Sequence, residues 1–346
     1  MKSTKSYILF AFSVVFISVF LSCKQNTEVS ETDKAHTDSL MAKLNSPELK
    51  AINQKILDDP NNADLYHERA KIYLALKQFE DAINDAKRSV RIDSTKAEYY
   101  LTEADIFFAA NKTRNSKDVL ELIVKKFPEN TEGLLKLGEL YFVVKQYENA
   151  FANINQALKV NVNLAKAYYL KGNIYKEVGD TAKAVSSLET ALEQDNKHYG
   201  AFVSLGLIYA SRKNPVALEY LDNAISLNPS STEALYAKAK FLQDVERFDE
   251  AVVMYNTILK VDSLHTNSVY NIGAIEFSVK NDAHKALDYF TKAIGMDHQY
   301  AEAYFARGAC YQELGDKANA RADYQMCLQL KKNYEPAIDG LNSLGK

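Results

Sequence analysis

The sequence predicts an all-α protein in which pairs of helices repeat along a solenoid, and three features indicate it. Small residues recur at a nearly constant interval of 33 to 35 residues, and a second series of small residues follows the first about twelve residues later. Aromatic residues keep a fixed place between the two series. The chain of 346 residues is longer than most single compact domains. Growth by repetition accounts for that length.

Each series of small residues has one member per repeat. The first series is Ala70, Ala104, Gly138, Gly172, Gly206, Ala239, Gly273 and Gly308. The second is Ala82, Ser116, Ala150, Ala184, Ala217, Ala251, Ala286 and Ala320. The aromatic residues three positions after the first series are Tyr73, Phe107, Tyr141, Tyr175, Tyr209 and Tyr311. Because two helices approach closely only where small side chains face each other, the two series predict the contacts within each helix pair.

This pattern resembles the tetratricopeptide repeat, a helix-turn-helix unit of 34 residues. The resemblance covers residues 63–334 and implies a right-handed superhelical solenoid of about eight repeats. Their expected ranges are 63–96, 97–130, 131–164, 165–198, 199–231, 232–265, 266–300 and 301–334. The seventh repeat has Glu276 in place of the aromatic residue and one extra residue before Ala286, so we expect it to be the least regular.

Shorter helices are expected on both sides of the repeats. Ser46-Pro47-Glu48 has the residues of a helix start, so residues 46–62 are expected to form an N-terminal capping helix. Residues 335–346 are expected to form a C-terminal capping helix. Solenoids need such caps because the outer faces of their terminal repeats are otherwise exposed and apolar.

The first 22 residues have the pattern of a secretory signal. Lys2 and Lys5 precede the apolar run from Ile8 to Leu21, which is shorter than the roughly 20 residues of a membrane-spanning helix. The stretch from Phe20 to Cys23 resembles a lipobox, so Cys23 is expected to carry the lipid and residues 23–45 to form a flexible polar linker. Lys24 resembles the second residue of outer-membrane lipoproteins, and we expect the protein to face the periplasm. An ordinary signal peptide that ends at Cys23 by chance is the alternative.

The charged residues, histidines and glycines of the sequence indicate a binding protein and not an enzyme. The net charge is −3 with no clustered basic surface, which argues against nucleic acid as a partner. The six histidines lack the spacing of a zinc site, and the regularly spaced glycines do not form a phosphate loop. We therefore expect no enzyme activity, no metal and no cofactor. Cys310 and Cys327 fall in the eighth repeat, either as two buried thiols or as a disulfide.

The resemblance also implies a binding surface. In this family the first helix of each repeat lines an inner groove through its second, fifth, ninth and twelfth positions. Here seven of the eight fifth positions are apolar or aromatic, with His67 in the first repeat, and the twelfth position adds Phe108, Phe142 and Phe277. The residues expected to bind a partner there are Leu101, Phe108, Leu135, Phe142, Tyr169, Tyr236, Tyr270, Phe277 and Phe305. The alternative interpretation is that this stripe packs against neighbouring helices.

We expect a membrane-anchored scaffold of the bacterial envelope that binds a segment of another protein in its concave groove. The mixed groove suits an amphipathic helix or an extended segment. The alternative is a carbohydrate-binding lipoprotein similar to those of starch uptake. The absence of Trp and of long inserts between the repeats weighs against that alternative. The sequence leaves the identity of the partner open.

Overall fold

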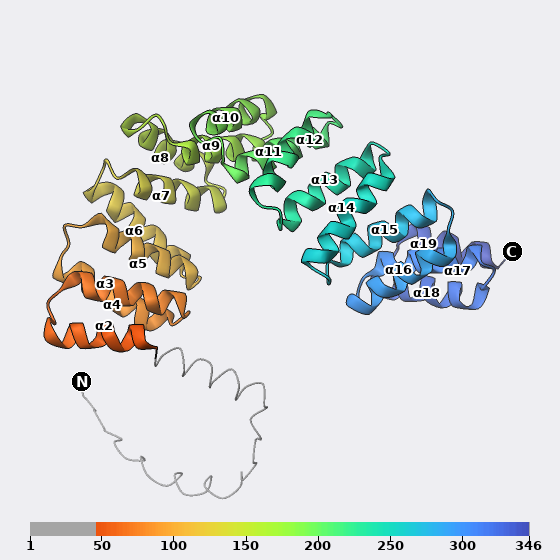
Figure 1. Ribbon diagram of the computed structural model, residues 1–346, viewed down its shortest axis with the longest axis horizontal. Coiled ribbons are helices and arrows are strands. Elements are labelled where there is room, and N and C mark those ends of the chain that lie inside the picture. The colour runs from red at the N-terminus through yellow and green to blue at the C-terminus, as the bar shows by residue number, and fades with distance from the viewer. Residues whose placement is uncertain (1–45, 346) are drawn as a thin grey trace, which may run out of the picture. The chain divides into compact units, whose positions relative to one another are not determined.

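The computed structural model describes residues 46–345, which form 18 α-helices and no strand (Figure 1). The expected signal segment 1–22, Cys23 and the linker 23–45 lie outside the described residues. No helix within the described range is long and apolar enough to cross a membrane. The all-α fold predicted from the sequence is confirmed.

The helices form successive pairs. The first helices are α3 (Ala63–Ala75), α5 (Ala97–Ala109), α7 (Thr131–Val143), α9 (Ala165–Glu177), α11 (Tyr199–Ser211), α13 (Thr232–Asp244), α15 (Thr266–Ser278) and α17 (Ala301–Glu313). The second helices are α4 (Phe79–Ile92), α6 (Thr113–Lys126), α8 (Tyr147–Val160), α10 (Thr181–Gln194), α12 (Val216–Leu227), α14 (Phe248–Val261), α16 (Ala283–Met296) and α18 (Lys317–Leu330). The helix α2 (Pro47–Asp58) precedes these pairs and α19 (Glu335–Leu344) follows them. Each first helix begins at the residue from which its expected repeat is numbered.

The chain divides into two compact units, residues 1–116 and 117–346. The described part of the first unit contains α2 to α5 and the beginning of α6. The second unit contains the rest of α6 and the helices from α7 to α19. Within each unit, helices pack on their neighbours in sequence, as α3 does on α4 and α9 on α10.

Short polar side chains and left-handed residues set the helix boundaries. The Asp180 carboxylate accepts a hydrogen bond from the Lys183 N–H at 3.1 Å and so caps α10. Just before it, Gly179 has a φ of +83°, which closes the turn from α9. Each of the other seven pairs described has one residue of positive φ in its turn. These are Lys77, Asn111, Lys145, Lys213, Glu246, Asn281 and Gly315.

The small residues lie where the two helices of a pair touch. A Cβ atom added to Gly172 would come within 2.6 Å of Leu188 Cγ, and one added to Gly206 within 2.7 Å of Leu221 Cγ. At Gly308 the nearest atom would be Tyr324 Cδ1, at 2.9 Å. Real Cβ atoms do not approach neighbours this closely. The prediction that these residues mark helix contacts is confirmed.

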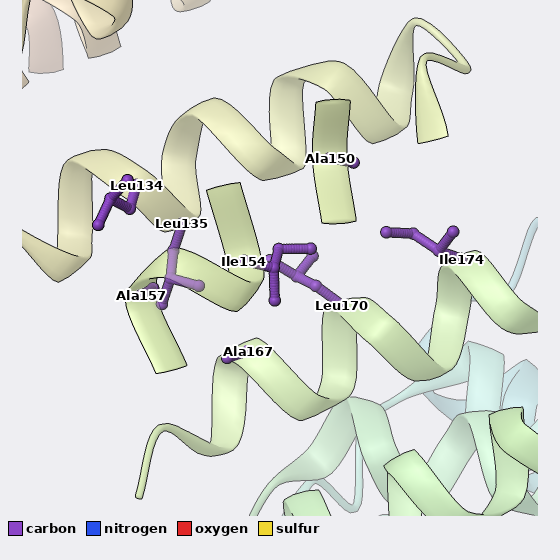
Figure 2. Close-up of a cluster of buried hydrophobic side chains, with 8 residues drawn as sticks. All are labelled: Leu134, Leu135, Ala150, Ile154, Ala157, Ala167, Leu170 and Ile174. Atoms are coloured by element: carbon purple, nitrogen blue, oxygen red, sulfur yellow. The ribbon is translucent and has the colours of Figure 1, made fainter. Parts of the chain in front are cut away.

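The core continues from one pair into the next. Figure 2 shows one such cluster, to which α7, α8 and α9 all contribute side chains. Its members are Leu134, Leu135, Ala150, Ile154, Ala157, Ala167, Leu170 and Ile174. Because the apolar face of α7 and α8 is completed by α9, the neighbouring pair supplies part of the burial that stabilises each repeat.

The pairs α3/α4 and α17/α18 each contain an ion pair of the same geometry, in which a partly exposed arginine binds a buried carboxylate. The Arg69 guanidinium binds the Asp85 carboxylate through two hydrogen bonds of 2.6 and 2.8 Å. Arg307 binds Asp323 in the same way, at 2.7 and 2.8 Å. Each guanidinium lies 5.6 to 5.9 Å from the centres of two tyrosine rings on its own helix. The carboxylate raises the pKa of each Arg. These two ion pairs were not predicted from the sequence.

The seventh pair differs from the others at its turn. The Glu276 side chain, which replaces the aromatic residue, is only 2% exposed, and its carboxylate accepts a hydrogen bond from Lys285 Nζ at 2.8 Å. Lys280 Nζ approaches the same oxygen at 3.5 Å. The turn between α15 and α16 has four residues, whereas the turn between α7 and α8 has three. The extra residue of this repeat therefore lies in the turn, beside a buried and paired carboxylate.

The two cysteines of the eighth pair are free thiols. Cys310 and Cys327 are both buried, and no disulfide joins them. Burial raises the pKa of Cys310 to about 12, because the charged thiolate is poorly solvated there. The sequence left open whether Cys310 and Cys327 are buried thiols or a disulfide. In the structure both are thiols that pack as small apolar side chains.

Candidate protein-binding surface

The nine residues expected to bind a partner all lie on first helices, but they differ in exposure. Leu101 of α5 and Leu135 of α7 are 7% and 6% exposed. Leu135 belongs to the core cluster of Figure 2. Val203 and His67, which occupy the same repeat position, are equally buried. The prediction of Leu101 and Leu135 as contact residues is therefore corrected: these short side chains pack between helices and offer almost no surface.

The phenylalanines at the twelfth position are more accessible. Phe108, at the end of α5 in the first unit, is 50% exposed. In the second unit, Phe142 and Phe277 are half-buried. Phe142 lies 6.3 Å from the ring of Tyr147, and Phe277 packs on the cluster around Phe290. These rings keep part of their surface free while their positions are fixed by packing.

The fifth-position aromatic residues of the second unit contact the next helix pair. Each half-buried ring packs against the ring of the residue at the N-cap position of the next first helix or, for Phe305, of α19. The pairs and the distances between ring centres are Tyr169–His198 at 4.7 Å, Tyr236–His265 at 5.3 Å, Tyr270–Tyr300 at 5.0 Å and Phe305–Tyr334 at 5.4 Å. Part of each ring therefore packs against the next repeat, as the alternative interpretation of the stripe expects. The rest of the ring remains exposed and can contact a partner.

Two of the capping residues have a further role at their helix ends. His198 Nδ1 accepts a hydrogen bond from the Ala201 N–H at 3.2 Å, and His265 Nδ1 accepts one from the Ser268 N–H at the same distance. A helix N-terminus has N–H groups without an intrahelical partner, and these imidazoles satisfy one of them. The contacts between the fifth-position rings and these N-cap residues were not predicted from the sequence. Their only signal is an aromatic residue or His placed 29 or 30 residues after each fifth-position ring.

Some charged groups of these repeats pair with each other. Lys331 Nζ lies 2.6 Å from a Glu302 carboxylate oxygen, and Lys240 Nζ lies 3.5 Å from one of Asp244. Burial raises the pKa of Tyr270 to about 12, so this phenol is neutral at physiological pH. Among residues 46–345, no group of three or more His, Cys, Asp or Glu side chains is arranged to hold a metal ion.

Sequence comparison identifies the repeats. The tetratricopeptide repeat family model matches residues 63–96, 165–198 and 301–334, which are three of the ranges predicted above. Human DnaJ homolog subfamily C member 7 is 24% identical over 336 residues, covering 88% of this chain and 68% of that protein. The human mitochondrial import receptor subunit TOM70 is 28% identical over 187 residues, covering 51% of this chain and 30% of that protein.

Solved structures share the fold. The C-terminal part of a TPR repeat-containing protein from Cytophaga hutchinsonii has a TM-score of 0.58 at 18% identity, covering 71% of this chain and 99% of that one. A tetratricopeptide repeat protein from Parabacteroides merdae has a TM-score of 0.50 at 19% identity, covering 72% and 99%. The fold thus defines a helical-repeat protein. Three of its helix pairs match the family model, so the chain contains tetratricopeptide repeats, and these repeats support a role as a protein–protein interaction scaffold.

Proposed function

We propose that this protein is a membrane-anchored scaffold of the bacterial envelope that binds a segment of another protein on the aromatic face of its first helices. The observation that carries the proposal is the recurrence of Tyr236, Tyr270 and Phe305 on three successive first helices. All three rings are half-buried and occupy the same repeat position. A bound segment would contact several of them together.

Fixed aromatic rings are effective anchors for a protein partner. They bury a large apolar area, and aromatic residues supply much of the energy of many interfaces. Because Tyr270 and Phe305 are already held by Tyr300 and Tyr334, little side-chain freedom is lost on binding. Binding of this kind requires no cofactor and no catalytic step.

The membrane anchor is supported by the N-terminal sequence. Lys2 and Lys5 precede the apolar run, and Ser22 supplies the small residue before Cys23. Two acyl chains on Cys23 would hold the protein stably at a membrane, where one chain binds only marginally. The Lys24 side chain after the cysteine supports the outer membrane, with the repeats on the periplasmic side.

Carbohydrate binding has less support. Flat sugar rings stack on open aromatic faces, whereas the rings of Tyr236, Tyr270 and Phe305 pack against neighbouring rings. No Trp is present in the sequence to offer a larger platform.

Truncating two of the anchor rings is expected to weaken partner binding. We expect the double variant Tyr270→Ala/Phe305→Ala to recover about tenfold less partner protein than wild type, because hot-spot rings contribute this much or more. The measurement is affinity capture of the full chain from detergent-solubilised envelopes, with folding checked by circular dichroism.

The control for this variant is Tyr175→Ala/Tyr220→Ala. These tyrosines also lose ring contacts, with Phe151 at 4.9 Å and Tyr209 at 5.5 Å, but they lie outside the fifth repeat position. We expect them to lower stability and leave capture intact. A partner retained by the first variant, or lost equally from both folded variants, would contradict the assignment of the surface.

The lipid is expected on Cys23 alone. Cells grown with a clickable fatty-acid analogue should label the wild-type protein, and the Cys23→Ala variant should carry no label because the acylated thiol is gone. Cys310→Ala is the matched control, since this thiol is buried and should have no part in acylation. Equal labelling of wild type and Cys23→Ala would refute the anchor.

A further inference from the structure

A histidine caps α11, the first helix of the fifth repeat. His198 Nδ1 accepts a hydrogen bond from the Ala201 N–H at 3.2 Å, so this ring nitrogen carries no proton. The proton of the neutral imidazole is therefore on Nε2. An amide cap such as Asn130 of α7 keeps its acceptor oxygen at every physiological pH, whereas an imidazole titrates near neutral pH. The cap of α11 therefore depends on the protonation state of one ring.

The same imidazole joins two repeats. Its ring lies 4.7 Å from the ring of Tyr169 on α9, in the fourth repeat. Tyr169 also lies against Gly200 at the start of α11, where an added Cβ atom would come within 2.9 Å of Tyr169 Cζ and Oη. Because Gly200 has no side chain, the tyrosine ring can approach the helix start this closely. We call the contact of His198, Gly200 and Tyr169 the His198 joint.

The surroundings of His198 favour its neutral form. Burial has the largest effect and lowers the pKa of the imidazole, because the charged form is poorly solvated between the two repeats. Two charged groups act on it in opposite directions. The Asp195 carboxylate of the preceding turn raises the pKa, and the Lys166 ammonium of α9 lowers it. An imidazolium is therefore disfavoured at the start of α11.

The histidine cap of α15 provides a comparison within the same chain. His265 Nδ1 accepts a hydrogen bond from the Ser268 N–H at 3.2 Å, and Ser268 Oγ lies 2.9 Å from the same nitrogen. A protonated Nδ1 can donate to this hydroxyl oxygen, so the imidazolium keeps a partner at the helix start. The corresponding residue of α11 is Ala201, whose methyl group offers no acceptor. Protonation is therefore expected to disturb α11 more than α15.

We infer that His198 makes the joint between the fourth and fifth repeats acid-sensitive, because protonation of Nδ1 removes the cap of α11 and loosens the contact. The new N–H would point at the N–H groups of the helix start, where the positive end of the helix dipole lies. Attraction between an imidazolium and the Tyr169 ring does not replace the lost acceptor. The inference goes beyond the proposed function, since it requires no partner.

The direction of the pKa shift gives the pH range. An unfolded histidine titrates at about pH 6.5, and burial lowers the pKa of folded His198 below this value. The neutral cap therefore contributes its full stability above about pH 6.5. This contribution is lost as the pH falls through the lower pKa of the folded state, because the unfolded chain then binds more protons than the folded one.

Hydrogen exchange of the full chain in detergent tests the inference. In the variant His198→Asn the amide oxygen can cap α11, and it does not titrate. We expect the Ala201 N–H to exchange at similar rates in wild type and variant at about pH 7.5, and about fivefold faster in wild type at about pH 5, as the loss of one cap implies. Residue 198 is not adjacent to Ala201, so the intrinsic exchange rate at each pH is the same in both proteins.

Two controls accompany this variant. His298→Asn changes an exposed histidine before α17, a helix without a side-chain cap, and should leave the exchange of Ala201 as in wild type at both pH values. Within the wild-type protein, acidification should reduce the protection of Ser268 less than that of Ala201, because His265 keeps Ser268 Oγ as a partner. This comparison needs no substitution, so the test holds even if His198→Asn does not fold.

Three results would overturn the inference. They are equal exchange of Ala201 in wild type and His198→Asn at both pH values, protection of Ala201 that is unchanged in acid, and an equal loss of protection at Ala201 and Ser268. The last result would indicate a general effect of acid and not one of the His198 joint. None of these measurements involves a partner, so their failure leaves the proposed function standing.

Discussion

Replacing Gly172 with alanine should lower the free energy of unfolding by about 1–2 kcal/mol, although alanine is the better helix former. The new methyl group would lie 2.6 Å from Leu188 Cγ and 3.2 Å from the Ala184 carbonyl oxygen. Leu188 is fully buried, so it cannot turn away without disturbing the core between α9 and α10. The overpacking therefore exceeds the gain of about 1 kcal/mol in helix propensity.

Gly295 is the matched control for this substitution. It also lies within a helix, α16, but a Cβ atom added there would meet nothing within 4 Å. Gly295→Ala should therefore raise the free energy of unfolding by about 0.5–1 kcal/mol. Denaturant unfolding followed by far-ultraviolet circular dichroism measures both variants. If both substitutions change the free energy of unfolding in the same direction, the helix contact assigned to Gly172 is refuted.

The Arg307→Met variant is expected to lose about 2–3 kcal/mol of stability, the largest effect predicted for a single change here. Asp323 is 8% exposed and would be left as a buried carboxylate without its two hydrogen bonds. Methionine replaces much of the apolar volume beside Tyr304 and Tyr311, so the loss reports mainly the orphaned charge.

Two further variants test this explanation. Arg247 also binds a carboxylate through two hydrogen bonds, to Glu250 at 2.6 Å each, but the pair is exposed. Arg247→Met should therefore unfold close to wild type. In the double variant Arg307→Met/Asp323→Leu, no charge is left unpaired, and much of the lost stability should return. A double variant as unstable as Arg307→Met would show that the charge is not the cause.

Helix packing was predictable because it repeats. Gly172 and Gly206 have counterparts in every pair, and close contact between helices is the physical reason for small residues at that spacing. The exposure of the stripe was not predictable from periodicity alone. The fifth position lies at the border between core and surface, so Leu135 is covered by the next pair, while the longer Tyr169 extends beyond it and remains partly exposed.

Interactions that occur only once or twice were missed. The Arg69–Asp85 and Arg307–Asp323 pairs appear in two repeats, and nothing in one sequence distinguishes such residues from ordinary surface charges before their geometry is known. The same holds for Glu276, whose burial beside Lys285 depends on where the extra residue of its turn lies.

The turns within the pairs differ in sequence, yet each contains one residue with a positive φ. Gly179 and Gly315 adopt a positive φ at little cost, but Lys77, Lys145, Lys213 and Glu246 adopt it too. For a residue with a side chain this conformation costs about 1–2 kcal/mol, so it must be imposed by the helices on either side. Selection on the architecture therefore acts on the helix contacts. We therefore expect comparison of homologous chains to find the turn residues more variable than the small residues at the helix contacts.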